Sequence, residues 1–319
     1  MMTLSQGVEP HVLAFLERLN NSGAAPIESL TPEEARQVLE DLQQQSSIDN
    51  GVTQQRQVID VDGRDVPLYI VTPAHATVAL PVFMFFHGGG WIQGSYATHQ
   101  RLVRDLVVLS GAACVFVDYS RSPEVRFPIA IEQAYSATCW VASRGDMLGL
   151  DASRISVVGD SAGGNMATVV CMMAKARGGP KISSQLLLYP VTDARFDTVS
   201  YQEWANGYFL TRGMMEWFWN NYLDSRDQRR LHLVSPLQAT REQLSGLPPA
   251  LIQTAEFDVL RDEAEAYARA LALAGVEVSC VRYNGLIHGF AQMNVLAKVP
   301  AVRAAVRQAA GELRYRLSC

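Results

Sequence analysis

The feature that most limits the possible folds is a series of eight short apolar segments, rich in β-branched and aromatic residues and bounded by Gly, Pro, Asp or Asn. These segments are residues 56–61, 66–73, 82–88, 113–120, 154–160, 185–190, 250–258 and 276–283. Amphipathic helical patterns separate most of the later ones, at residues 98–110, 129–144, 162–177 and 261–274. Near-continuous apolar strands with intervening helices form mostly parallel sheets that are covered on both faces. The sequence therefore predicts an α/β fold with an eight-stranded, mostly parallel sheet, and a ligand site at the carboxyl ends of the strands.

Two segments lie outside this alternation. Residues 1–50 look helical, and Thr31, Pro32 and Glu34 have the pattern of a helix start, with an N-cap, a proline in the first turn and a capping box. The sequence YFLTRGMMEWFWNNYL, residues 208–223, lies in the long stretch between the sixth and seventh apolar segments. Its aromatic and methionine content fits local core packing or a helical cap above the sheet, and the two interpretations are compatible.

The fifth apolar segment runs into GDSAG, residues 159–163, which matches the G-x-S-x-G pattern between a strand and a helix. The small residues are needed because a nucleophilic serine on such a turn has a strained backbone and close neighbours. The alternative is an ordinary serine that caps a helix, but the strand before and the helix after favour Ser161 as a nucleophile. We expect Asp160 to hydrogen-bond the turn and nearby loops rather than to orient a base.

The third apolar segment is followed by HGGGW, residues 87–91. Glycines at a strand end allow close approach to a substrate, and backbone N–H groups there could stabilise a developing oxyanion. The candidate donors are Gly88, Gly89, Gly90 and Ala162. The alternative interpretation is a flexible turn. A phosphate-binding loop is disfavoured because neither G-x-G-x-x-G nor G-K-[ST] is present. We expect His87 to be a buried organiser of this loop rather than a base.

Two late residues complete a nucleophile–base–acid set. Asp258 ends the seventh apolar segment, and His288 follows the eighth. A serine nucleophile needs a base for its proton and a carboxylate that orients the base. The chain order Ser161, Asp258, His288 is the one expected for an α/β hydrolase.

Other histidines and acids are weaker candidates. Glu256 is expected to point along the strand end, and Asp262 falls in the first turn of the following helix. Of the six histidines, only His288 is late, at a strand end and followed by glycine. The remaining histidines are His11, His75, His87, His99 and His232.

Together these residues resemble the bacterial hormone-sensitive-lipase-like esterases of the α/β-hydrolase superfamily. The HGGGW and GDSAGGN blocks are typical of that family, and DYSRSPEVRFPIA (118–130), FDVLRDEAEAYARAL (257–271) and HGF (288–290) resemble three further blocks. The resemblance covers about residues 55–315. Val259 stands where the family usually has proline, and SRSPEVR replaces a commoner RLAPEHP; both departures lie beside the site and concern substrate fit, not the catalytic residues.

The resemblance implies Ser161 as nucleophile, Asp258 as orienting acid, His288 as base and an oxyanion hole from Gly89, Gly90 and Ala162, with Gly88 in the same loop. It also implies N-terminal helices (1–50) that contribute to a cap, and a catalytic domain (51–319) with a cap insertion at about 196–225. Family members frequently dimerise through the edge of the sheet, so a homodimer is possible.

Composition narrows the remaining classes. The net charge of −5 argues against a nucleic-acid partner, because phosphate contacts need clustered Lys and Arg. Five scattered cysteines without a C-x-x-C pair fit reduced thiols, and no basic and apolar leader or long apolar run is present, so we expect a cytoplasmic protein without a membrane partner.

The expected function is therefore hydrolysis of small-molecule carboxylic esters with short to medium chains, through a Ser-His-Asp triad and an acyl-enzyme, without metal or cofactor. Candidate substrate-contacting residues are Trp91, Tyr208, Phe209 and Met215. The same triad could hydrolyse amides or lactones. A non-catalytic ligand receptor on this fold is disfavoured because serine, acid and histidine are all present.

Overall fold

The computed structural model describes residues 6–44 and 51–318. Residues 1–5, 45–50 and 319, which the predicted domain limits include, lie outside the described residues. The strands are β1 (Val52–Val61), β2 (Arg64–Pro73), β3 (Leu80–Phe86), β4 (Ala113–Val117), β5 (Leu150–Asp160), β6 (Ser184–Leu188), β7 (Ala250–Phe257) and β8 (Val278–Ile287). They form one sheet in the order β1-β2-β4-β3-β5-β6-β7-β8. Strand β2 pairs antiparallel with β1 and β4, and all other neighbours are parallel, so the predicted sheet is confirmed.

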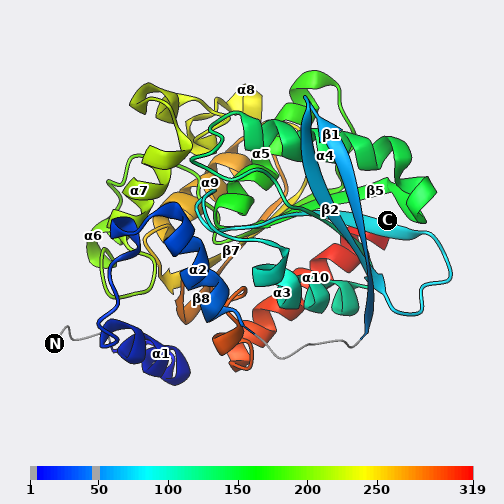
Figure 1. The fold of residues 1–319 in the computed structure, drawn as a ribbon. Helices are drawn as coiled ribbons and strands as arrows, with labels where there is room; N and C mark the ends of the chain where they lie inside the picture. The colour runs from blue at the N-terminus through cyan, green and yellow to red at the C-terminus, as the bar shows by residue number, and fades with distance from the viewer. Residues whose placement is uncertain (1–5, 45–50, 319) are drawn as a thin grey trace.

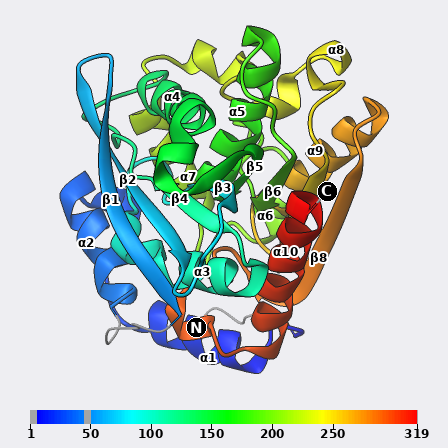
Figure 2. The same ribbon diagram turned by 90° about the vertical axis from the view of Figure 1, so that its right-hand side faces the viewer.

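Helices cover both faces of this sheet (Figure 1). Helices α3 and α10 lie on one side and α4 and α5 on the other, as the view turned by 90° also shows (Figure 2). The α-helices are α1 (Pro10–Asn20), α2 (Pro32–Leu42), α3 (Tyr96–Ser110), α4 (Ile129–Arg144), α5 (Ala162–Arg177), α6 (Val199–Glu203), α7 (Arg212–Tyr222), α8 (Arg241–Leu244), α9 (Arg261–Leu273) and α10 (Pro300–Ser318). Short 3-10 helices are η1 (Ile27–Ser29), η2 (Gly145–Leu148), η3 (Arg226–Arg230), η4 (Pro236–Gln238) and η5 (Asn294–Leu296). No helix within residues 6–44 or 51–318 has the length and apolar character that crossing a membrane requires.

The two faces of the sheet have separate hydrophobic cores because successive strand side chains point in opposite directions. In β3, Val82, Met84 and Phe86 join the core beneath α4 and α5, whereas Phe83 and Phe85 join the core beneath α3 and α10. All five side chains are fully buried. This explains why the segment reads as a continuous apolar run instead of an alternating one.

The N-terminal segment begins its second helix as predicted. The Thr31 hydroxyl accepts a hydrogen bond from the Glu34 N–H, and the Glu34 carboxylate accepts one from the Thr31 N–H, which completes the capping box before Pro32. Helix α2 contacts α3, and the preceding η1 contacts α7. The N-terminal segment therefore lies beside α7, which comes from the long stretch between β6 and β7 (Figure 1).

Four strands end at the same edge of the sheet, because parallel strands share their direction. Strand β3 runs into HGGGW, residues 87–91, which we call the glycine loop. Strand β5 runs into Ser161, β7 into Asp258 and β8 into His288. The sheet thus brings together residues from four distant parts of the chain.

Candidate active site

Ser161 occupies a sharp turn between β5 and α5, residues 159–163, which we call the elbow. Its φ of 54° and ψ of −120° lie in a region that residues with a side chain rarely adopt. A Cβ atom added at Gly159 would lie 2.0 Å from the Gly163 carbonyl oxygen, and one at Gly163 would lie 1.9 Å from the Phe86 carbonyl oxygen. Since both clashes involve backbone, only glycine fits at either position, and the turn holds the Ser161 hydroxyl in one place.

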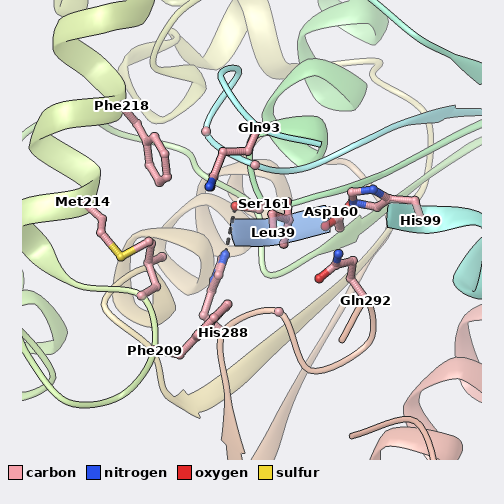
Figure 3. A pocket seen from close by; sticks show the side chains of 14 residues that line it. Leu39, Gln93, His99, Asp160, Ser161, Phe209, Met214, Phe218, His288 and Gln292 are labelled. Carbon is pink, nitrogen blue, oxygen red and sulfur yellow. Dashed lines mark hydrogen bonds and ion pairs between the residues drawn. The ribbon is translucent and has the colours of Figure 1, made fainter. Parts of the chain in front are cut away.

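The Ser161 hydroxyl is the first member of a hydrogen-bonded chain. Its Oγ lies 2.9 Å from His288 Nε2 (Figure 3). On the other side of the ring, His288 Nδ1 lies 2.8 Å from Asp258 Oδ2. The other Asp258 oxygen accepts the Leu260 N–H at 2.9 Å. Because a carboxylate only accepts, the proton on the imidazole belongs on Nδ1, which leaves Nε2 free to accept the Ser161 proton. The structure thus brings the three predicted residues together with base and acid in the expected order.

The glycine loop divides into a bonded and an open part. The Gly88 N–H donates to Asp160 Oδ1 at 2.9 Å, so this group is already occupied and its assignment as an oxyanion donor is corrected. Among the described residues, the N–H groups of Gly89, Gly90 and Ala162 have no hydrogen-bond acceptor. Gly89 and Gly90 also line the pocket that contains Ser161.

Asp160 supports this loop from inside the protein. Besides the Gly88 N–H, its carboxylate lies 3.3 Å from Nε2 of His99, a residue of α3 that also lines the pocket. The prediction that Asp160 serves nearby loops and not His288 is confirmed. His99 was predicted only as a helix residue, because nothing in the sequence indicates that α3 turns this side chain toward the elbow.

His87 lies below the loop and is fully buried. Its Nδ1 donates to the Gly88 carbonyl at 2.8 Å, and its ring stacks on Tyr119 with centroids 4.2 Å apart. Burial holds the pKa of His87 well below its usual range, and the nearby His99 acts in the same direction. The expectation of a buried organiser is confirmed.

A pocket opens above Ser161, with about 470 Å³ of empty space that includes solvent at its open side. Its polar side chains are those of Ser161, His288, Asp160, His99, Gln93 and Gln292. We call its apolar side chains the pocket wall, and they are Leu39, Phe209, Leu210, Met214 and Phe218 (Figure 3).

Of the four residues predicted to contact substrate, only Phe209 lines this pocket. Trp91 is fully buried and stacks on Tyr222, with centroids 4.2 Å apart. Tyr208 stacks on Phe257, and Met215 is buried in the core. The prediction for Trp91, Tyr208 and Met215 is therefore corrected, because their side chains serve packing.

The wall residues that the sequence missed come from two segments. Met214 and Phe218 are four residues apart on α7 and so share one face of that helix. Leu39 is supplied by α2. The spacing of Met214 and Phe218 was a usable signal, but Met215 and Trp219 have the same spacing and face the core instead.

Comparison with known proteins finds related hydrolases. Residues 83–292 match the family described as the alpha/beta hydrolase fold. The solved structure of a thermostable esterase from Pseudomonas putida ECU1011 is 54% identical, with a TM-score of 0.97 over 99% of each chain. Carboxylesterase NlhH of Mycobacterium tuberculosis is 37% identical over 82% of each chain. An ethyl acetate hydrolase of Pseudomonas putida is 32% identical over 90% of this chain and 92% of its own.

The family match spans well over half of the chain, and the relatives cover nearly all of it. The positions of the site residues at strand ends, the glycines on both sides of Ser161 and the identity of the relatives all agree with the family resemblance of the sequence motifs. The chain therefore belongs to the alpha/beta hydrolase fold family, in its hormone-sensitive-lipase-like group, and is a carboxylic ester hydrolase.

Proposed function

We propose that the chain hydrolyses short- to medium-chain carboxylic esters through an acyl-enzyme on Ser161. The observation that carries this proposal is the hydrogen-bonded chain from Ser161 Oγ through His288 to Asp258, at 2.9 and 2.8 Å. A serine hydroxyl is a weak nucleophile by itself, and an adjacent oriented base activates it. Each step described below uses groups of the chain and water only.

In the first step, His288 Nε2 takes the Ser161 proton while Oγ attacks the ester carbonyl carbon. The carbonyl oxygen becomes an oxyanion, which the N–H groups of Gly89, Gly90 and Ala162 would stabilise, supported by the N-terminus of α5. When the tetrahedral intermediate collapses, the imidazolium gives its proton to the departing alcohol. Asp258 stabilises the imidazolium meanwhile and keeps its own charge.

In the second step, water replaces the alcohol. As water attacks the carbonyl carbon of the acyl-enzyme, His288 accepts a proton from it, and a second oxyanion forms beside the same N–H donors. Collapse of this intermediate returns the proton to Ser161 and releases the carboxylic acid. The products are one alcohol and one acid for each ester and water consumed.

The pocket wall supports the proposed chain length. Five apolar side chains around a space of limited volume favour an apolar acyl or alcohol group of limited size. We propose that the N-terminal helices and the segment at about 196–225 form the predicted cap, since Leu39, Phe209, Leu210, Met214 and Phe218 all belong to them. Homodimerisation and a cytoplasmic location stay predictions.

The test is a series of p-nitrophenyl esters with acyl chains of increasing length, assayed with the wild type and the Ser161→Ala variant. We expect turnover by the wild type that declines for long chains, and a loss of at least about 10³-fold in Ser161→Ala. His232→Ala serves as the histidine control, because this residue lies outside the pocket and contacts Gln243. Undiminished turnover by Ser161→Ala, or loss of activity in His232→Ala but not in His288→Ala, contradicts the assignment.

A further inference from the structure

Gln43 is a polar side chain at the end of α2 that is buried although it lies outside the triad and the pocket. It is the C-cap residue of α2 and only 4% exposed. Its Nε2 donates to the carbonyls of Thr98 and Gln292, both at 2.8 Å, and its Oε1 accepts the Asn294 N–H at 2.9 Å. Both amide protons and the amide oxygen therefore have partners.

The partners of Gln43 belong to the two segments that support catalysis. Gln292 lies four residues after His288, in a turn closed by a 3.0 Å hydrogen bond from the Gln292 N–H to the Gly289 carbonyl. Thr98 precedes His99, whose ring faces Asp160. One side chain thus connects the loop that carries His288 with the helix that supports the elbow (Figure 3 shows His288, Gln292, His99 and Asp160).

The opposite end of α2 is fixed to the residues directly after the glycine loop. Arg36 Nε donates to the Ile92 carbonyl at 2.8 Å, and Gln93 Nε2 donates to the Ala35 carbonyl at 2.5 Å. Leu39 lies one helical turn from both Ala35 and Gln43 and lines the pocket. Helix α2 therefore contacts the residues directly after the glycine loop, the pocket and the loop that carries His288 along one face.

A purely local role for Gln43 does not account for these contacts. A residue at the end of a helix can satisfy free carbonyls of that helix, but within residues 6–44 and 51–318 the partners of the Gln43 side chain are all at least 55 positions away. The neighbouring Gln44, in contrast, bonds to Asp41 of its own helix and is exposed. Arg101 of α3 is a second anchor, since it also donates to the Gln292 carbonyl.

We propose that Gln43 is a positioning residue for the ester hydrolysis described above. By holding the Gln292 carbonyl and the Asn294 N–H, it keeps the loop after β8 in the conformation that aligns His288 with Ser161. The hydrogen bonds that hold α2 over the pocket then also hold the loop that aligns His288. The inference rests on the proposed roles of Ser161 and His288.

The test compares Gln43→Met, similar in length but unable to form these bonds, with Gln37→Met on the exposed side of the same helix, where Gln37 donates to Asp41 of its own helix. Kinetics with p-nitrophenyl acetate are normalised to active sites titrated with a fluorophosphonate, at a temperature where both variants are folded by circular dichroism. We expect kcat of Gln43→Met to fall about 10- to 100-fold, with KM within about twofold of wild type, because small misplacements of a base are costly. Gln37→Met should behave as wild type.

An unchanged kcat per titrated site, or a raised KM with unchanged kcat, overturns the proposal, because α2 would then act on stability or substrate binding alone. If Gln43→Met does not fold, Gln43→Asn provides the same measurement, since it keeps an amide that is one methylene too short. Failure of the proposed function is recognised separately, by absent turnover in the wild type or full turnover in Ser161→Ala.

Discussion

The catalytic edge of the sheet and the pocket wall above it are built in different ways. At the edge, the glycine loop and the elbow approach so closely that backbone atoms limit the geometry: a Cβ at Gly163 would lie 1.9 Å from a carbonyl oxygen of β3. In the wall, side chains such as Leu39, Met214 and Phe218 from α2 and α7 limit the space. Apolar side chains can repack when one of them changes, whereas main chain held in a sheet cannot.

This difference separates reaction from selectivity. Substitutions at the edge should abolish turnover whatever the ester, because they move the nucleophile or the N–H donors. Substitutions in the wall should leave the reaction intact and change which ester fits. The predictions below test this separation, beginning with the largest effect.

Gly163→Ala should lower kcat/KM by at least about 10³-fold. The reason is that the added methyl group collides with the Phe86 carbonyl and displaces the elbow. Purified variant protein is assayed with p-nitrophenyl acetate, and its fold is followed by circular dichroism. Gly311→Ala is the control, since no atom of the described residues lies within 4 Å of a Cβ at that position of α10. An active Gly163→Ala enzyme would show that the elbow tolerates movement.

Gly89→Ala should lower kcat about 10²–10³-fold, the loss typical of one missing oxyanion donor. Gly89 has φ of 105°, and a Cβ there would lie 2.6 Å from the Gln93 carbonyl oxygen. Gly111→Ala offers a matched control, because Gly111 also has positive φ (77°) but an open surrounding. The control should lose about 1 kcal/mol of unfolding free energy without a change in kcat. Equal kcat losses in both variants would mean that backbone strain alone explains the effect.

Met214→Ala should shift selectivity toward longer acyl chains, with the hexanoate-to-acetate ratio of kcat/KM rising about tenfold. The adjacent Met215→Ala should leave this ratio unchanged, because Met215 packs in the core and does not line the pocket. Both variants should lose about 2–5 kcal/mol of unfolding free energy, so stability is matched while selectivity is not. The measurement is a chain-length series on each variant. A shift in Met215→Ala alone would reverse our placement of the wall.

The smallest expected effect concerns the pH dependence of stability at the catalytic edge. Burial lowers the pKa of His87 in the folded protein, whereas the unfolded chain has the ordinary value near 6.5. At a pH between these two values, the imidazole is protonated in the unfolded chain but neutral in the folded protein, so acid favours unfolding. The contribution of His87 to stability is therefore complete above about pH 6.5 and declines as the pH falls below it. Between pH 7.5 and 5.5 we expect a loss on the order of 1 kcal/mol.

Urea unfolding of the wild type and His87→Asn at these two pH values measures that contribution. The asparagine amide retains a donor for the Gly88 carbonyl but does not titrate. The variant should be less stable overall, yet its unfolding free energy should fall less on acidification, by a difference on the order of 1 kcal/mol. Identical pH dependence in both proteins would show that His87 does not titrate differently on folding.

The edge could be predicted from the sequence because its determinants are local. Each apolar segment and its terminating residues indicate a strand, and the glycines around Ser161 indicate the elbow. Since parallel strands end together, Asp258 and His288 could be placed beside Ser161 before any coordinates. The exception was Gly88, whose N–H is taken by Asp160, a contact that depends on the rotamer of one side chain.

The pocket wall could not be predicted in the same way, because it depends on how helices rotate against the core. Met214 and Met215 are adjacent and chemically identical, and only packing within α7 decides which one faces the pocket. There Trp219, four residues after Met215, lies against Trp91 with ring centroids 4.7 Å apart. Gln43 gave no signal at all, because its partners are distant backbone groups.

The most direct test of the central claim is covalent labelling with a fluorophosphonate, followed by mapping of the modified peptide by mass spectrometry. Our account predicts one adduct per chain, on Ser161, with loss of esterase activity in proportion to labelling. Complete inactivation with an unmodified Ser161, or an adduct on another serine of the active enzyme, would contradict it.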